Sequence, residues 1–82
     1  MSEVWGLEDK ARRILQASAV EAYGRAGVYV LMSEVMKRTS VSDPEEFRAI
    51  AEYLEWQGWI SEADPDYGVF VLTPEGIDIA EH

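Results

Sequence analysis

The alternation of apolar and polar positions predicts four helices and three strands, and the clearest of these elements is a helix over 44–57. The apolar residues of this segment recur at spacings of three, four and seven, which places them on one helical stripe: Phe47, Ile50, Ala51 and Leu54. One face of this helix is therefore expected in the core, and the opposite face is left for solvent or a partner.

Both ends of this central helix carry residues that favour helix termini. The Asp43 carboxylate can accept the free N–H groups of the first turn, and Pro44 fits the first helical position, where no N–H is needed. Glu45 and Glu46 complement the positive end of the helix dipole. Gly58 supplies the left-handed residue with which helices commonly end.

Shorter elements are predicted on either side of the central helix. A first helix begins near Leu7, and its apolar stripe is formed by Leu7, Ala11, Ile14, Leu15, Ser18 and Ala22. Gly24 and Gly27 end this helix. Runs of β-branched and aromatic residues then predict short strands at 28–31, 59–63 and 69–72.

Two further short helices are predicted from their first residues. Ser33 is expected to cap a helix through 34–38. Thr73 is expected to cap a last helix, with Pro74 at its first position. Gly76 would let that last helix approach its neighbours closely.

The predicted order is helix, strand, helix, helix, strand, strand, helix, so the fold class is α+β and mostly helical. The turn residues at 64–68 join the last two strands into a small antiparallel hairpin. Such short strands are not stable alone and must pack on the helices. With 82 residues the chain suits one small domain, which we assign to residues 1–82.

Two stretches of the chain carry a resemblance to a known family. At 53–60 the sequence is Tyr-Leu-Glu-Trp-Gln-Gly-Trp-Ile, in which a Leu is followed four residues later by a Gly and then by two apolar residues. At 72–77 it is Leu-Thr-Pro-Glu-Gly-Ile, which opens the last helix. With a hairpin between these stretches, the chain resembles the winged helix-turn-helix family over essentially its whole length. The resemblance implies a winged-helix fold with the hairpin as its wing.

In that family the third helix usually lies in the major groove of DNA, and the wing touches the flanking backbone. The resemblance therefore implies a DNA-binding transcriptional regulator of the prokaryotic cytoplasm. The residues it places on the DNA-facing side are Ser42, Glu45, Arg48, Ala49 and Glu52. It also places Lys37 and Arg38 near phosphate, although these cations can equally serve only to complement the dipole of their own helix.

The charge of the chain opposes this implication. The net charge is -9, from 16 acidic and 7 basic residues, and the predicted wing has three acids and no base. Glutamate can accept a hydrogen bond from cytosine, but it cannot replace the cations that supply most of the affinity for DNA. A second hypothesis is therefore an acidic protein-interaction module that does not bind DNA, with a face formed by Glu45, Arg48, Ala49, Glu52, Tyr53 and Trp56.

The tryptophans leave alternatives open. Trp56 lies almost opposite the core stripe, so it is either an exposed interface anchor or a side chain that folds over the wing. Trp59, at the start of a strand, is expected to pack in the core or hairpin. Trp5 either staples the start of the first helix or extends to a partner chain. Many members of the family form homodimers, and the first helix together with Trp5 is the interface we suggest for one.

The sequence gives no support for catalysis, a metal site, a cofactor or a small-molecule site. The chain has no cysteine, and its one histidine is His82, which is either native or the remnant of a purification tag. It has no apolar run of about 18 residues, and its start lacks the basic and apolar regions of a signal peptide. We therefore expect a non-enzymatic cytoplasmic protein without a membrane span.

Overall fold

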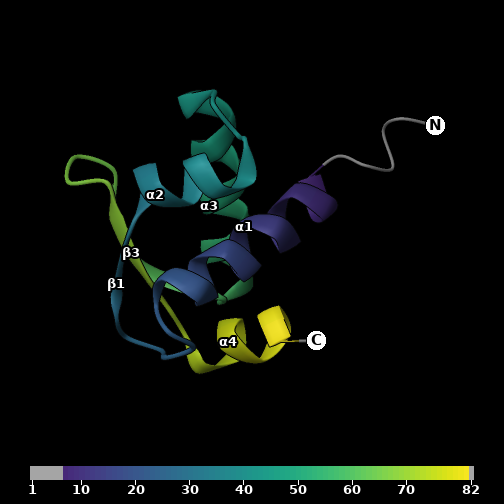
Figure 1. Ribbon diagram of the computed structural model, residues 1–82, viewed down its shortest axis with the longest axis vertical. Coiled ribbons are helices and arrows are strands. Elements are labelled where there is room, and N and C mark those ends of the chain that lie inside the picture. Colours follow the sequence, from purple (N-terminus) through teal and green to yellow (C-terminus); the bar gives the residue numbers. More distant parts are fainter. Residues whose placement is uncertain (1–6, 82) are drawn as a thin grey trace.

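The computed structural model describes residues 7–81, which form four helices and a three-stranded antiparallel sheet (Figure 1). The elements are α1 (Leu7–Glu21), β1 (Tyr29–Leu31), α2 (Met32–Thr39), α3 (Pro44–Gln57), β2 (Ile60–Asp64), β3 (Val69–Leu72) and α4 (Pro74–Glu81). The α+β class and the order of elements predicted from the sequence are confirmed. Trp5 and His82 lie outside the described residues.

The helices pack against one face of the sheet, in which β3 lies between β1 and β2 (Figure 1). Val30 of β1 is paired with Phe70 of β3, and Ile60 of β2 is paired with Leu72. Since side chains alternate along a strand, these four point to the same face, and all of them are buried in the core. The β2–β3 hairpin projects away from the helices at the left of Figure 1.

The predicted apolar stripe of α3 faces this core. Phe47, Ile50, Ala51 and Leu54 are all buried. From α1 the core receives Ala11, Ile14, Leu15 and Ser18, and the Ser18 hydroxyl donates a hydrogen bond to the Ile14 carbonyl (2.6 Å). The core therefore fixes the orientation of α3 and leaves its opposite side uncovered.

Both predicted termini of α3 are confirmed. The Asp43 carboxylate accepts a hydrogen bond from the Glu45 N–H (3.0 Å), and Pro44 occupies the first turn. Gly58 has a φ of 83°, and its N–H donates to the Glu55 carbonyl (3.0 Å). The helix is thus held at both ends by residues that the sequence identifies.

The start of α4 is attached to the corner between α3 and β2. The Thr73 hydroxyl donates to the Gly58 carbonyl (2.6 Å) and accepts from the Gly76 N–H (3.0 Å), which confirms Thr73 as a cap. A Cβ atom on Gly76 would lie 2.0 Å from the Trp59 carbonyl oxygen. The predicted close approach at Gly76 is therefore confirmed, and its partner is the backbone of Trp59.

The predicted start of α2 is wrong. Ser33 does not cap this helix, because β1 runs into α2 without a loop and Leu31 takes the capping position with no side-chain hydrogen bond. The Met32 N–H is satisfied instead by the Gly68 carbonyl of the hairpin (2.7 Å). A backbone acceptor from a distant segment thus replaces the local side-chain cap.

Candidate functional site

The side of α3 opposite the core is exposed along its whole length. We define the outer face of α3 as Glu45, Arg48, Ala49, Glu52 and Trp56, all of which are exposed. Trp56 is 84% exposed, so it does not fold over the hairpin. Ser42, just before the helix, is exposed as well. The residues predicted at 42–52 for a DNA-facing side therefore share one accessible surface.

This outer face is mainly acidic. Arg48 is its one base and the only base between residues 45 and 72. Within residues 7–81, Arg48, Glu52 and the neighbouring Glu55 have no ion-pair partner. Their charges are therefore not neutralised by any side chain that the structure describes.

The hairpin extends the acidic surface. Its Asp64 carboxylate accepts hydrogen bonds from the N–H groups of Asp66 (3.1 Å) and Tyr67 (3.3 Å), which closes the turn. The Tyr29 hydroxyl donates to the Glu62 carboxylate (2.7 Å). This hydrogen bond and the charge of Glu62 raise the pKa of Tyr29 above its ordinary value of 10.0. Two hairpin carboxylates therefore hold the local structure together, whereas the exposed Asp66 side chain accepts no such bond from the described part of the chain.

A groove of about 590 Å³ lies between α2, α3 and the hairpin. We call it the α2–α3 groove. Its lining residues are of two kinds. We call the uncharged ones the floor: Met32, Met36, Pro44, Phe47, Ala51, Ala63, Pro65 and Gly68. We call the charged ones the rim: Arg48, Glu52, Glu55 and Asp66. The groove thus shares Arg48 and Glu52 with the outer face of α3.

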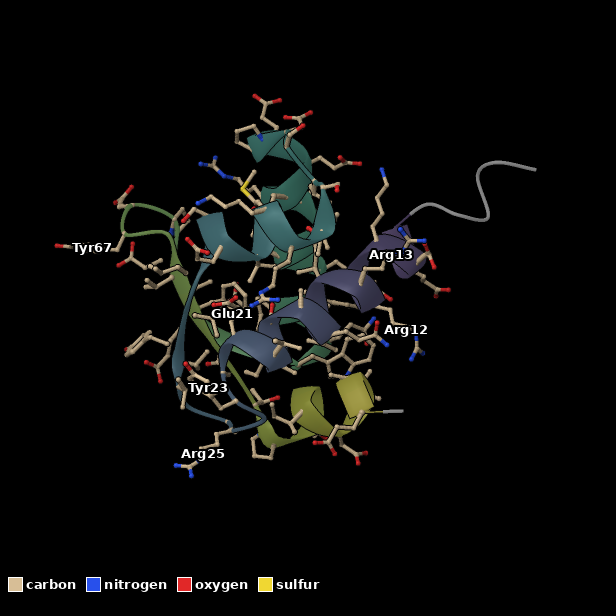
Figure 2. All side chains as sticks on the ribbon, viewed as in Figure 1. Arg12, Arg13, Glu21, Tyr23, Arg25 and Tyr67 are labelled. Carbon is tan, nitrogen blue, oxygen red and sulfur yellow. The ribbon has the colours of Figure 1, made fainter. Side chains whose placement is uncertain are left out.

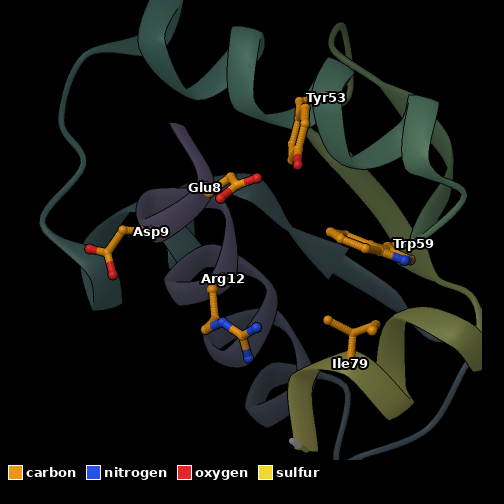
Figure 3. A pocket seen from close by; sticks show the side chains of 6 residues that line it. All are labelled: Glu8, Asp9, Arg12, Tyr53, Trp59 and Ile79. Atoms are coloured by element: carbon orange, nitrogen blue, oxygen red, sulfur yellow. The ribbon is translucent and has the colours of Figure 1, made fainter. Parts of the chain in front are cut away.

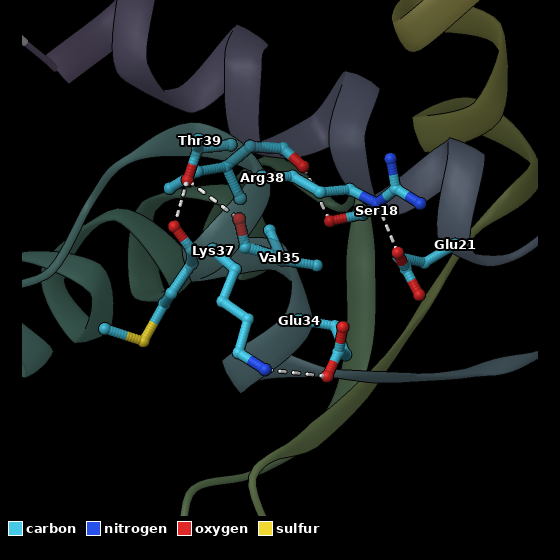
Figure 4. A network of polar contacts seen from close by, with 9 residues as sticks. Ser18, Glu21, Glu34, Val35, Lys37, Arg38 and Thr39 are labelled. Carbon is cyan, nitrogen blue, oxygen red and sulfur yellow. Dashed lines mark hydrogen bonds and ion pairs between the residues drawn. The ribbon is translucent and has the colours of Figure 1, made fainter.

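Lys37 and Arg38 are engaged inside the molecule (Figure 4). The Lys37 Nζ atom lies 3.5 Å from the Glu34 carboxylate, one turn earlier on α2. Arg38 pairs through Nε with Glu21 and so ties α2 to α1. Both side chains stay largely exposed, but a phosphate would have to compete with a carboxylate for each of them.

The other bases are spread over different sides of the molecule. Figure 2 shows Arg12 and Arg13 on α1 at the right and Arg25 at the lower left, while Tyr67 marks the hairpin at the far left. Arg13 lies 3.3 Å from Asp9 on its own helix, and Lys10 pairs with Glu46 of α3. They therefore do not form a basic surface around the outer face of α3.

Tyr53 lies on another side of α3 from Trp56. Its ring packs edge-on against Trp59, with ring centroids 6.3 Å apart and an interplanar angle of 84°. Both rings are partly buried and line an open pocket of about 380 Å³ (Figure 3). The other lining residues are Glu8, Asp9, Arg12 and Ile79. Trp59 thus has the packing role predicted for it, and Tyr53 is positioned beside Trp59 rather than beside Trp56.

Among residues 7–81, no group of three or more His, Asp or Glu side chains is placed to hold a metal ion. No helix in this range is long and apolar enough to cross a membrane. Comparisons of the chain with protein-family models, curated proteins and solved structures found no match. The site must therefore be interpreted from its own chemistry.

The α2–α3 groove was not predicted from the sequence. Met32 and Met36 are four residues apart on one helix, which is a visible signal, but the same spacing is typical of core positions. The hairpin residues Ala63 and Pro65 are far away in sequence from both methionines. Only the tertiary structure brings these segments to one groove.

Proposed function

We propose that this chain is a winged helix-turn-helix domain that binds a protein through the outer face of α3. The order of its elements and the hairpin after the third helix support the winged-helix assignment. The observation that carries the function is the charge of the exposed surface, where Arg48 is the single base beside the carboxylates of α3 and the hairpin. A DNA backbone would be repelled by this surface, and few phosphates could be neutralised.

Trp56 is the proposed anchor of the protein contact. A large aromatic side chain that is 84% exposed keeps apolar area in water, and burying this area against a partner is favourable. Tryptophan is also enriched among the residues that dominate binding energy at interfaces. The acidic residues beside Trp56 would select a partner with complementary basic groups.

A photocrosslinking experiment tests this proposal. A photoreactive phenylalanine analogue is placed at position 56 of the full chain in cells of the source organism, and adducts are treated with protease or nuclease. The matched control carries the same analogue at Tyr23, which is 85% exposed but lies in the turn after α1. We expect a protease-sensitive adduct of defined mass at position 56 and none at position 23. Adducts that nuclease removes would contradict the proposal.

The second candidate is the DNA-binding transcriptional regulator. It is favoured by the winged-helix order of elements and by Arg48, which is exposed and has no ion-pair partner within residues 7–81. Titration with random duplex DNA tests it, because non-specific attraction is largest at low salt. We expect no binding at about 50 mM salt. Binding that weakens steeply with salt and is lost in Arg48→Ala would instead establish the regulator.

A further inference from the structure

We propose that the α2–α3 groove binds the apolar side of a basic amphipathic helix. The inference depends on the proposed protein-binding function and specifies the chemistry of the partner. The groove is lined by residues of two helices, α2 and α3, and by residues of the hairpin. An amphipathic helix laid in a groove between helices is one of the recurring modes of peptide recognition.

The apolar floor suits side chains of a partner helix. Met32 and Met36 lie one turn apart on α2, and Phe47 and Ala51 lie one turn apart on α3. Both methionines are only partly buried, so a partner can cover more of their surface. Methionine side chains are flexible and adapt to the shape of an apolar ligand. The small side chains of Ala51 and Ala63 leave volume that larger partner residues can fill.

The rim requires a basic partner. Glu52, Glu55 and Asp66 are exposed, and none of them has an ion-pair partner among residues 7–81. By contrast, Asp9, Glu21, Glu34 and Glu46 are each paired with a base. The rim also holds Arg48, so its three carboxylates outnumber its one base, and this excess of negative charge complements lysine or arginine residues that flank an apolar stripe. An acidic helix would be repelled by the same rim.

A second copy of this chain does not fit the groove as well. α1 has the most bases of the described helices, but Ala11, Ile14 and Leu15 of its apolar stripe are buried in its own core. The other described helices contribute few bases, and each copy has a net charge of -9. The charge therefore favours a different, basic partner.

Fluorescence titration of the full chain with labelled model peptides tests the inference. The probe is a peptide with leucines at helical spacings of three and four, flanked by lysines. One control peptide has the same composition in scrambled order, and another has glutamate in place of lysine. We expect saturable binding of the probe and at least about tenfold weaker binding of both controls, which corresponds to roughly 1.4 kcal/mol.

Matched variants locate the binding site. The double variant Glu52→Lys with Glu55→Lys reverses the charge of two rim residues. The double variant Glu75→Lys with Glu81→Lys makes the same change in net charge at exposed positions of α4. We expect the rim pair to weaken binding by about tenfold and the α4 pair by less than about twofold. Met36→Ala, which changes the floor without a change in charge, should also weaken binding severalfold.

Four outcomes would overturn the inference. Equal losses of probe affinity in the two double variants would show that the peptide is attracted to an acidic protein in general and does not bind in the groove. Probe binding that survives in the rim pair and in Met36→Ala would place the peptide elsewhere. Absence of probe binding, together with a protein adduct at position 56, would reject the groove and leave the proposed function standing. A duplex DNA that binds and competes with the probe would reject both.

Discussion

At the scale of single residues, the contact between Gly76 and the Trp59 backbone sets a strict limit on side-chain size. A Cβ atom at position 76 would lie 2.0 Å from the Trp59 carbonyl oxygen and 2.9 Å from its carbon, so α4 or the start of β2 would have to move. We expect Gly76→Ala to lower the free energy of unfolding by about 1–3 kcal/mol, as overpacked sites do. Urea denaturation measures this change. Glu75→Ala, at the exposed neighbouring position, should change the same quantity by less than about 0.5 kcal/mol.

The hydrogen bond between Tyr29 and Glu62 gives a prediction about pH. The pKa of Tyr29 is raised because its hydroxyl donates to Glu62 and because ionised tyrosine would be repelled by that carboxylate. The raised pKa means that the stabilisation is fully present below pH 10, near the unfolded pKa, and is lost as the pH rises through the higher folded value.

Glu62→Gln should lower the pKa of Tyr29 towards 10.0, since the negative charge is removed and an acceptor is kept. The measurement is the ultraviolet absorbance of tyrosinate against pH. The curve of a Tyr29→Phe variant is subtracted, so that the difference reports Tyr29 alone. An unchanged titration curve in Glu62→Gln would mean that the charge of Glu62 does not act on Tyr29 in solution.

At the scale of elements, α3 depends on its first turn. Asp43→Ala removes the acceptor of the Glu45 N–H and leaves that donor to water. We expect a loss of about 1 kcal/mol in the free energy of unfolding, the usual effect of deleting such a cap. Circular dichroism during thermal unfolding would measure it. Ser42→Ala, one residue earlier and exposed, is the control, and an equal loss there would assign the effect to general helix propensity instead.

The elements that could be predicted are those whose signals are local. The cap, the stripe and the terminal glycine of α3 are all within 16 consecutive residues, from Asp43 to Gly58, and each has its predicted structural role. The start of α2 was missed because the acceptor for the Met32 N–H comes from Gly68, which is far away in sequence. The α2–α3 groove could not be predicted for the same reason, because its lining residues come from three segments that are separate in the sequence. The outer face of α3 could be predicted because the helical period that places the apolar stripe also determines which residues lie opposite it.

At the scale of the whole molecule, the net charge of -9 makes stability sensitive to salt. Repulsion among the carboxylates of α3 and the hairpin opposes the compact state, and salt screens it. The four ion pairs among residues 7–81 act in the other direction, but they lie on partly exposed side chains, where such pairs contribute little. We expect the melting temperature to rise by a few degrees between about 10 and 150 mM sodium chloride.

Differential scanning calorimetry at constant pH checks this salt dependence. The double variant Glu52→Lys with Glu55→Lys lowers the magnitude of the net charge and should show a smaller rise. A melting temperature that falls with salt would mean that the four ion pairs outweigh the repulsion.

The bond from the Met32 N–H to the Gly68 carbonyl joins one wall of the α2–α3 groove to the end of the hairpin. Its amide proton can exchange with solvent only when this hydrogen bond opens. Where exchange at this position is faster than global unfolding, we expect it to report the opening of the groove in the absence of any partner. The first amide of α2, which lacks a side-chain cap, is in this way a natural probe of how often the groove changes width.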